Sequence, residues 1–109
     1  MTLSYHQAGS VLEIAIEEVH FEAGAARKFE EEVHHGPAFA DAHSLNIDMG
    51  HVERIDSLAV HSLLALQEMM PQAQSVISLI NPQPPVQRVL RMLRLDRVFR
   101  IESRPVVAA

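Results

Sequence analysis

The stretch from Ser44 to Met70, SLNIDMGHVERIDSLAVHSLLALQEMM, decides the fold of this chain. Its first six residues alternate apolar and polar side chains, which is typical of a strand with one buried face. From Ser57 onward the stretch is mostly apolar until Pro71, so a helix is expected over Ser57–Met70. The segment 50–56 joins the two and ends at the pair Asp56-Ser57. Such a strand-to-helix unit predicts an α/β fold.

The rest of the chain alternates strands and helices in the same way. Strands are predicted over Val11–Glu17, Ser75–Ile80 and Val98–Ile101, and helices over Phe21–His35 and Val86–Leu93. This order predicts a mixed β-sheet of four to five strands with about four helices packed on it. We expect a single domain over residues 1–109, with its core at about 11–101 and flexible terminal tails.

Several side chains can be assigned from these patterns. Gly36-Pro37 and Pro71 are expected to end helices, and Pro84-Pro85 to stand in or before the first turn of another. The Glu30–Glu32 run is expected to face water. The predicted core side chains of the last helix and its surroundings are Val86, Val89, Leu90, Leu93 and Met92.

Composition and charge exclude several classes of function. The chain has no cysteine, which excludes disulfides, thiol catalysis and cysteine-ligated metals. Its net charge of −5 disfavours nucleic acid as a partner. No stretch approaches the roughly 20 apolar residues that span a bilayer, and Met1–Ser10 does not have the pattern of a secretory signal. We therefore expect a cytoplasmic protein without membrane insertion. Its oligomeric state stays open because edge strands could pair between copies.

The charge is distributed unevenly along the chain. Residues 1–55 hold ten acids and three bases, a net charge of −7, whereas residues 56–109 hold four acids and six bases, a net charge of +2. Arginine recurs at every third position from Arg88 to Arg100. On a helix this spacing drifts by about 60° per step, so the arginines spread over a broad face. A solvated helix surface is one interpretation, and an acidic or phosphorylated protein partner is the other.

Ser57 allows two interpretations from physical chemistry alone. A serine hydroxyl at a helix start can accept a hydrogen bond from a backbone N–H two or three residues on, which makes it a structural cap. If the same oxygen were phosphorylated, it would carry nearly two negative charges beside the positive end of the helix. The residue is therefore either a cap or a regulatory switch.

The histidines predict neither a metal site nor an active site. The adjacent pair His34-His35 would point about 100° apart on a helix, and His43, His51 and His61 could meet only through the tertiary fold. Ser57 and His61 are one helical turn apart, as a nucleophile and its base could be. A hydrolase also needs an orienting acid and an oxyanion hole, and neither is evident. We expect no enzyme activity, no cofactor and no metal.

Two stretches resemble the STAS family, the module named for sulfate transporters and anti-sigma factor antagonists. Ile55–Val60, IDSLAV, is similar to the family's strand-to-helix turn IDSSGL. Leu79–Leu90, LINPQPPVQRVL, and Leu95–Phe99, LDRVF, are similar to the corresponding parts of the family pattern LVNPSPEVRRVLELTGLDRLF. With the order of elements before them, the resemblance covers about Val11 to Ile101. It implies a small STAS-like α/β fold with a mixed sheet.

The resemblance also implies a protein-binding switch without catalysis of its own. In bacterial single-domain members, a partner serine kinase phosphorylates the serine that follows the aspartate, and a phosphatase removes the phosphate. The dephosphorylated form binds the kinase or anti-sigma factor and frees a sigma factor. Carried over to this chain, the phosphoacceptor is Ser57, and Asp56, Leu58 and His61 contact the partner.

The turn departs from the family pattern in one respect. Leu58 and Ala59 stand where a small or hydroxylated residue and then glycine are common. Leu58 adds an apolar side chain beside the Ser57 hydroxyl. An alternative function is therefore a constitutive STAS-like subunit that docks on a larger assembly, such as a lipid-transport ATPase complex. Ser57 would then be a cap or a contact without turnover of phosphate.

Overall fold

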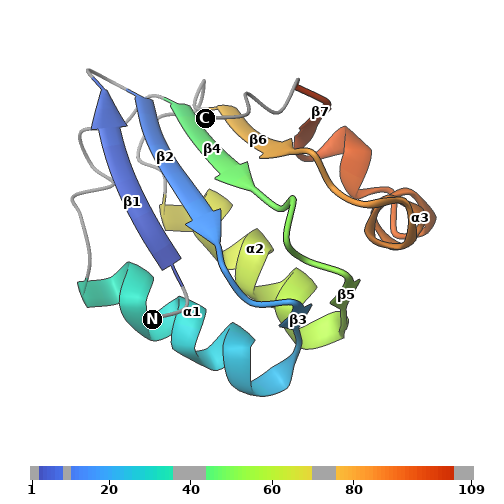
Figure 1. The fold of residues 1–109 in the computed structure, drawn as a ribbon, viewed down its shortest axis with the longest axis horizontal. Coiled ribbons are helices and arrows are strands. Elements are labelled where there is room, and N and C mark those ends of the chain that lie inside the picture. Colours follow the sequence, from blue (N-terminus) through green and yellow to red (C-terminus); the bar gives the residue numbers. More distant parts are fainter. Residues whose placement is uncertain (1–2, 9–10, 36–43, 70–75, 105–109) are drawn as a thin grey trace.

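A mixed five-stranded sheet forms the centre of the molecule (Figure 1). The computed structural model describes residues 3–8, 11–35, 44–69 and 76–104. The strands lie in the order β1-β2-β4-β6-β7, where β1 is Leu3–Ala8, β2 Val11–Ile16, β4 Ser44–Asp48, β6 Val76–Ile80 and β7 Arg100–Glu102. β1 runs antiparallel to β2, and the other neighbours are parallel. The predicted fold class is thus confirmed.

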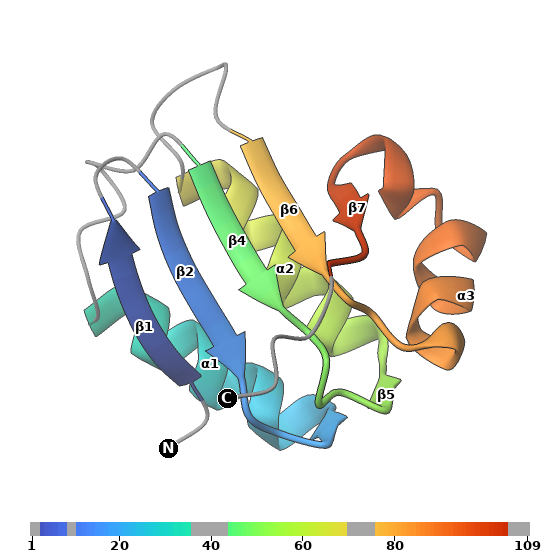
Figure 2. The same cartoon turned by 45° about the horizontal axis from the view of Figure 1, so that its top comes forward.

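Three α-helices and one single-turn 3-10 helix account for the helices of the described residues. They are α1 (Ala23–His35), α2 (Ser57–Met69), α3 (Pro84–Met92) and the 3-10 helix η2 (Leu95–Arg97). A second sheet of two short parallel strands pairs β3, His20–Phe21, with β5, Arg54–Ile55. Helices α1 and α2 pack side by side along the sheet, and α3 lies beyond β6, away from α1 (Figure 2). None of the helices among the described residues is long and apolar enough to cross a membrane.

Alternation along β2 and β4 buries one face of these two strands, whereas both faces of β6 are buried. Every second side chain of β2, and likewise of β4, is buried, and the core side chains from the sheet include Leu12, Ile14, Ile16, Leu45, Ile47 and Leu79. Between them, Glu13 and Asn46 point to the other face, where their side chains lie 3.5 Å apart. This period of two is the physical reason that the pattern of these strands could be predicted.

Two aromatic rings tie the small sheet to α1. Phe21 of β3 and Phe29 of α1 are both fully buried, and their rings meet edge to face with centroids 5.2 Å apart. Ala26 is buried on the same side of the helix. The helix predicted over Phe21–His35 thus begins two residues later, at Ala23, because Phe21 belongs to β3. The contact between the two rings holds α1 where β3 ends.

The third helix, predicted over Val86–Leu93, spans Pro84–Met92 and so begins two residues earlier and ends one residue earlier than predicted. Pro84-Pro85 occupies its first turn, where no N–H is needed, and Val86 and Leu90 are buried. The predictions for Met92 and Leu93 were wrong, since their side chains are 81% and 52% exposed.

The backbone after α3 explains this correction. Arg94 adopts a left-handed conformation with φ 58° and ψ 31°, which ends the helix and turns the chain. After this turn, Leu95 and Phe99 are the residues that reach the core, at 5% and 2% exposure. Residues at the end of α3 are consequently left on the surface.

The amino-terminal strand is a further correction. The sequence predicts a flexible tail before residue 11, yet Leu3–Ala8 forms β1 and pairs along its whole length with β2, from Leu3 opposite Ile16 to Ala8 opposite Val11. The predicted helix ends at Gly36-Pro37 and Pro71 lie outside the described residues.

Candidate functional site

The cap at the start of α2 is Asp56. Its Oδ1 accepts a hydrogen bond of 2.9 Å from the backbone N–H of Ala59, three residues on, and its backbone carbonyl accepts another from Val60 at 3.1 Å. These are the contacts of an N-cap residue, so Ser57 is the first residue inside the helix. The interpretation of Ser57 as the cap was therefore wrong, because its acidic neighbour fills that position.

Ser57 itself lies on the surface. Its side chain is exposed, and no hydrogen bond joins its hydroxyl to another residue of the described part of the chain. Leu58 follows it with 54% of its side chain exposed, whereas Ala59 is fully buried. A hydroxyl and an apolar side chain thus stand next to each other in water at the first turn of α2.

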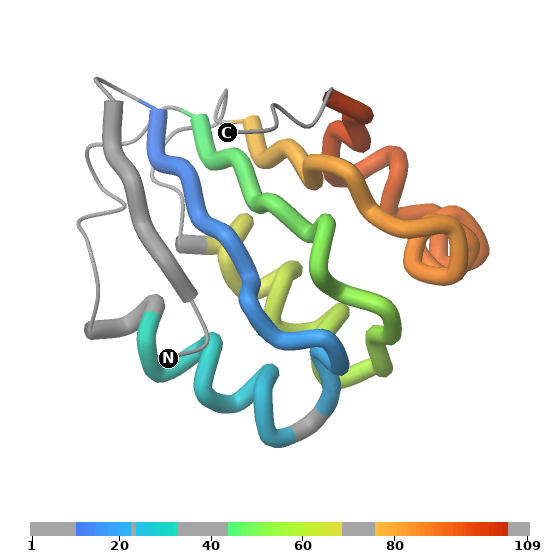
Figure 3. Tube along the Cα trace, in the orientation of Figure 1, coloured from blue at the N-terminus to red at the C-terminus, as the bar shows by residue number. Residues whose placement is uncertain are grey.

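The segment before Ser57 is fixed to the sheet by backbone hydrogen bonds. Just beyond β4, Met49 donates to the carbonyl of Ile80 at 2.9 Å, and Val52 donates to Met49 at 3.0 Å. Glu53 then donates to the carbonyl of Val19 at 2.7 Å. Val52 is fully buried, so the connection between β4 and α2, green in Figure 3, is anchored on both sides. The position of Ser57 is therefore set by the core.

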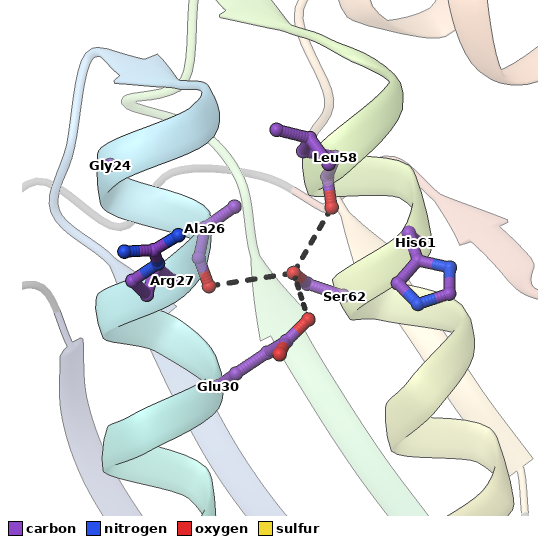
Figure 4. Close-up of a pocket in the computed structure, with 7 residues that line it drawn as sticks. All are labelled: Gly24, Ala26, Arg27, Glu30, Leu58, His61 and Ser62. Atoms are coloured by element: carbon purple, nitrogen blue, oxygen red, sulfur yellow. Dashed lines mark hydrogen bonds between the residues drawn. The ribbon is translucent and has the colours of Figure 1, made fainter.

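A hollow of about 490 Å³ lies between α1 and α2, beside this turn. Its lining residues are Gly24, Ala26, Arg27, Glu30, Leu58, His61 and Ser62. Figure 4 shows Arg27 and Glu30 on α1, opposite Leu58 and His61 on α2. Two of the predicted contact residues, Leu58 and His61, thus line one groove, and Asp56 and Ser57 precede them as the cap and the first residue of α2.

The floor of this groove holds a contact that was not predicted from the sequence. Ser62 is 2% exposed, and its hydroxyl lies 2.7 Å from Oε1 of Glu30, 3.1 Å from the carbonyl of Leu58 and 3.4 Å from that of Ala26 (Figure 4). The single hydroxyl proton is best donated to the carboxylate, which is the closest acceptor. Glu30 was expected to face water and instead joins α1 to α2, across 32 positions of sequence.

Charged side chains surround the turn before α2. Nη2 of Arg54 lies 3.2 Å from both ring nitrogens of His20 and 3.9 Å from Oε1 of Glu22. Arg54 and Glu22 are 61% and 41% exposed, so water screens this ion pair. Within the described residues, no three histidine, aspartate or glutamate side chains gather as a metal site requires. His51 and His61 are exposed, and His43 lies outside the described residues.

Solved structures of several bacterial proteins share this fold. The Thermotoga maritima protein TM1081, described as an anti-sigma factor antagonist, has 19% sequence identity and a TM-score of 0.77 over 95% of this chain and 87% of its own. An anti-sigma factor antagonist (STAS) domain protein from Planctomyces limnophilus has 18% identity and a TM-score of 0.76, over 94% and 91% of the two chains.

The anti-sigma factor antagonist SpoIIAA is similar in two states. Its unphosphorylated form has 13% identity and a TM-score of 0.75 over 94% of this chain and 88% of its own. The phosphorylated form, from Bacillus, has 12% identity and a TM-score of 0.70 over 94% and 91%. At these identities the likeness shows the fold alone.

The sequence itself gives the family. No curated protein matches the chain. The model of the family described as "Mlab, STAS domain" matches residues 5–103, which is nearly the whole chain and includes both stretches that resembled the STAS pattern. The chain therefore belongs to the STAS domain family.

Proposed function

We propose that this protein is a cytoplasmic regulatory module of the anti-sigma factor antagonist type, which binds a partner protein through the first turn of α2. The partner is a serine kinase or anti-sigma factor, or another regulatory protein. Reversible phosphorylation of Ser57 by the kinase, and its removal by a phosphatase, switches binding. In this proposal Asp56, Leu58 and His61 contact the partner, and none of the residues is catalytic.

The observation that carries the proposal is the exposure of Ser57 beside a cap made by Asp56. A kinase needs a hydroxyl that it can reach, and a switch needs one whose modification leaves the fold intact. Because the Asp56 carboxylate satisfies the helix end, the Ser57 hydroxyl is available for modification without loss of a capping bond. The backbone anchors of the segment 49–53 hold the backbone that leads into Ser57 in one position for a partner.

Electrostatics favour an effect on the partner over an effect on the domain. A phosphate at a helix start gains about 0.3–1 kcal/mol from the helix field, and the nearby Asp56 carboxylate opposes this gain. Arg54 is already in contact with His20 and Glu22. A partner that packs on Leu58, in contrast, would have to desolvate a dianion next to an apolar contact. Phosphorylation should then release the partner while the domain stays folded.

The known forms of SpoIIAA support this reading by analogy. That protein, which shares this fold, has been solved both unphosphorylated and phosphorylated. Modification within this fold is therefore compatible with the folded state in at least one relative. Because the sequence identity is only 12–13%, this comparison supports the proposal through the shared fold alone.

A constitutive docking subunit is the second candidate, and Leu58 is the observation that favours it. An apolar side chain with 54% of its surface exposed, beside a groove of about 490 Å³, suits a permanent contact on a larger assembly such as a lipid-transport ATPase complex. In that case Ser57 would be part of the interface, and charge at this position would not be used as a signal.

The two candidates separate in one experiment. The protein is purified from its native cell under several growth conditions, and its intact mass is measured, with fragmentation to locate any added phosphate. In parallel, Ser57→Ala and Ser57→Asp proteins are used to retain partners from native lysate, with Ser57→Thr as the conservative control. Phosphate on Ser57 and loss of the partner only with Ser57→Asp support the switch. Equal retention by Ser57→Ala and Ser57→Asp, with no phosphate found, would refute it and leave the docking subunit.

A further inference from the structure

The segment 84–100 carries an excess of positive charge that the Ser57 site does not use. We call it the C-terminal lobe; it comprises α3, the turn at Arg94, η2 and the first residue of β7. It holds five arginines and one acid, a net charge of +4, in a chain whose net charge is −5. The five arginines, all exposed, are Arg88, Arg91, Arg94, Arg97 and Arg100. The lobe is therefore a basic region on an otherwise acidic protein.

Most of these arginines form no ion pair with a carboxylate of the described residues. Among the described residues, the ion pairs within 4.0 Å use Arg54, Arg100 and Arg104. The arginines at 88, 91, 94 and 97 are absent from these pairs, and the single acid of the lobe, Asp96, is also outside them. Their guanidinium groups are thus available to a carboxylate from another molecule.

Apolar side chains are exposed among the same arginines. Met92, Leu93 and Val98 are 81%, 52% and 40% exposed, which makes them half of the large apolar residues exposed on the described surface. The buried face of α3 is formed by Val86 and Leu90, and Leu95 and Phe99 are the buried residues after it. Met92, Leu93 and Val98 therefore remain on the surface. Exposed apolar side chains that lie among basic ones mark a surface for contact with another molecule.

We propose that the C-terminal lobe is a second docking surface, which binds an acidic protein segment that also presents apolar side chains. Charge complementarity favours a partner segment with negative charge, and Met92, Leu93 and Val98 supply apolar contact area. The basic residues of the lobe are all arginine, with no lysine. Arginine binds carboxylates in a bidentate fashion and is enriched in protein interfaces, together with methionine.

Two other kinds of partner fit less well. A helix that lies on a membrane needs a wide apolar face, and the apolar face of α3 is buried against the core. Nucleic acid is disfavoured because residues outside the lobe carry a net charge of −9, from thirteen acids and four bases. An acidic protein segment needs only the local surface, and it is the occupant that the observations favour.

The end of the lobe that carries the exposed apolar side chains lies away from the candidate site at Ser57. Helix α2 begins directly after β5, and α3 contacts β5 near its own first turn. Met92 is the last residue of α3 and is followed by η2, which contacts β7 (Figure 2). A partner on the lobe would therefore bind independently of charge at Ser57. The domain could join two proteins, one of them under phosphorylation control.

The test begins in the native cell with a photo-reactive amino acid at position 92. The same amino acid at position 19 serves as the control, because Val19 is 45% exposed on another part of the surface. Crosslinked chains are identified, and the crosslinked segment is mapped by mass spectrometry. The proposal expects a protein captured at position 92 and not at position 19, through a segment with net negative charge. Capture of lipid or nucleic acid, or of a segment without excess acid, would overturn it.

Affinity measurements with the mapped segment as a synthetic peptide complete the test. Arg91→Glu and Met92→Ser should each weaken binding about tenfold. Lys28→Glu changes the net charge by the same amount as Arg91→Glu but lies on α1, and it should change affinity less than twofold. Ser57→Asp should have no effect, which separates this surface from the proposed switch. Equal weakening by Lys28→Glu, or no effect of Met92→Ser, would contradict a specific docking surface. All of these side chains are exposed, and unfolding curves verify that each variant is folded.

Discussion

Asp56→Ala should lower the stability of the domain, whereas Ser57→Ala should leave stability nearly unchanged and remove the proposed phosphorylation site. The carboxylate of Asp56 accepts the Ala59 N–H at 2.9 Å, and its loss leaves an orphan donor in the first turn of α2. Removal of such a cap costs about 1 kcal/mol, within a range of roughly 0.5–2. Ser57 is exposed and lies inside the helix, so Ser57→Ala should stay within about 0.5 kcal/mol of the original protein.

Urea unfolding measures this difference directly. With a slope of about 2 kcal/mol per molar urea, the loss of 1 kcal/mol lowers the unfolding midpoint by about 0.5 M. In a thermal scan of this 109-residue chain, the same loss corresponds to about 4 °C. Ser57→Ala should shift neither midpoint by more than half as much.

Asp56→Asn is the matched control for the role of charge. Asparagine caps helices as well as aspartate does, so its amide oxygen can accept the Ala59 N–H, whereas interactions that need the negative charge, such as that with the helix field, are lost. This variant should therefore lie between the original protein and Asp56→Ala. If Ser57→Ala were as destabilising as Asp56→Ala, the hydroxyl would be the real cap, and the structural basis for a freely modifiable Ser57 would be gone.

Three other substitutions test the packing around the site and the lobe. Arg94→Gly should raise the free energy of unfolding by about 1 kcal/mol in a urea titration, because glycine adopts φ 58° without a Cβ penalty. Arg94→Ala retains the Cβ and should give no gain in the same titration. Ser62→Ala removes the 2.7 Å bond to Glu30 and should cost about 1 kcal/mol. A loss equally large in a background of Glu30→Ala, which has no side-chain acceptor, would rule out this bond as the cause. Phe29→Ala leaves a cavity beside Phe21 and should cost about 3–5 kcal/mol, seen as a large drop in thermal midpoint; a loss below 1 kcal/mol would contradict the packing.

The parts of the fold that could be predicted are those in which local pattern and burial agree. Every second residue of β2 and β4 is apolar and buried, so periodicity alone gave these strands to within about one residue. The strand β1 was missed, since polar residues interrupt its sequence and its pairing with β2 is what makes it a strand. Met92 and Leu93 were misassigned because their exposure depends on where α3 ends, and that point is set by the backbone of Arg94.

The candidate site was likewise predictable in part, where local sequence determines the structure. The resemblance pointed to the pair at 56 and 57, and Leu58 and His61 both line the groove, while their role as partner contacts stays a prediction. The identity of the cap could not be predicted, since aspartate and serine are equally good N-caps and a shift of one residue in the helix start exchanges them. The bond between Ser62 and Glu30 joins two helices that are adjacent only in the folded chain. No local pattern carries that information.

Because Asp56 caps α2, the neighbouring residue at position 57 can be modified or replaced without loss of the capping hydrogen bond. If one side chain both capped α2 and received phosphate, each modification would remove a stabilising hydrogen bond, and the signal would be coupled to partial loss of structure. With the cap on Asp56, the residue at 57 can be neutral, charged or bulky while the Ala59 N–H stays bonded at 2.9 Å. A charge at position 57 then changes mainly the binding free energy of a molecule that packs against Leu58, and hardly the free energy of unfolding. This is the condition for a switch that acts on binding and leaves folding unchanged.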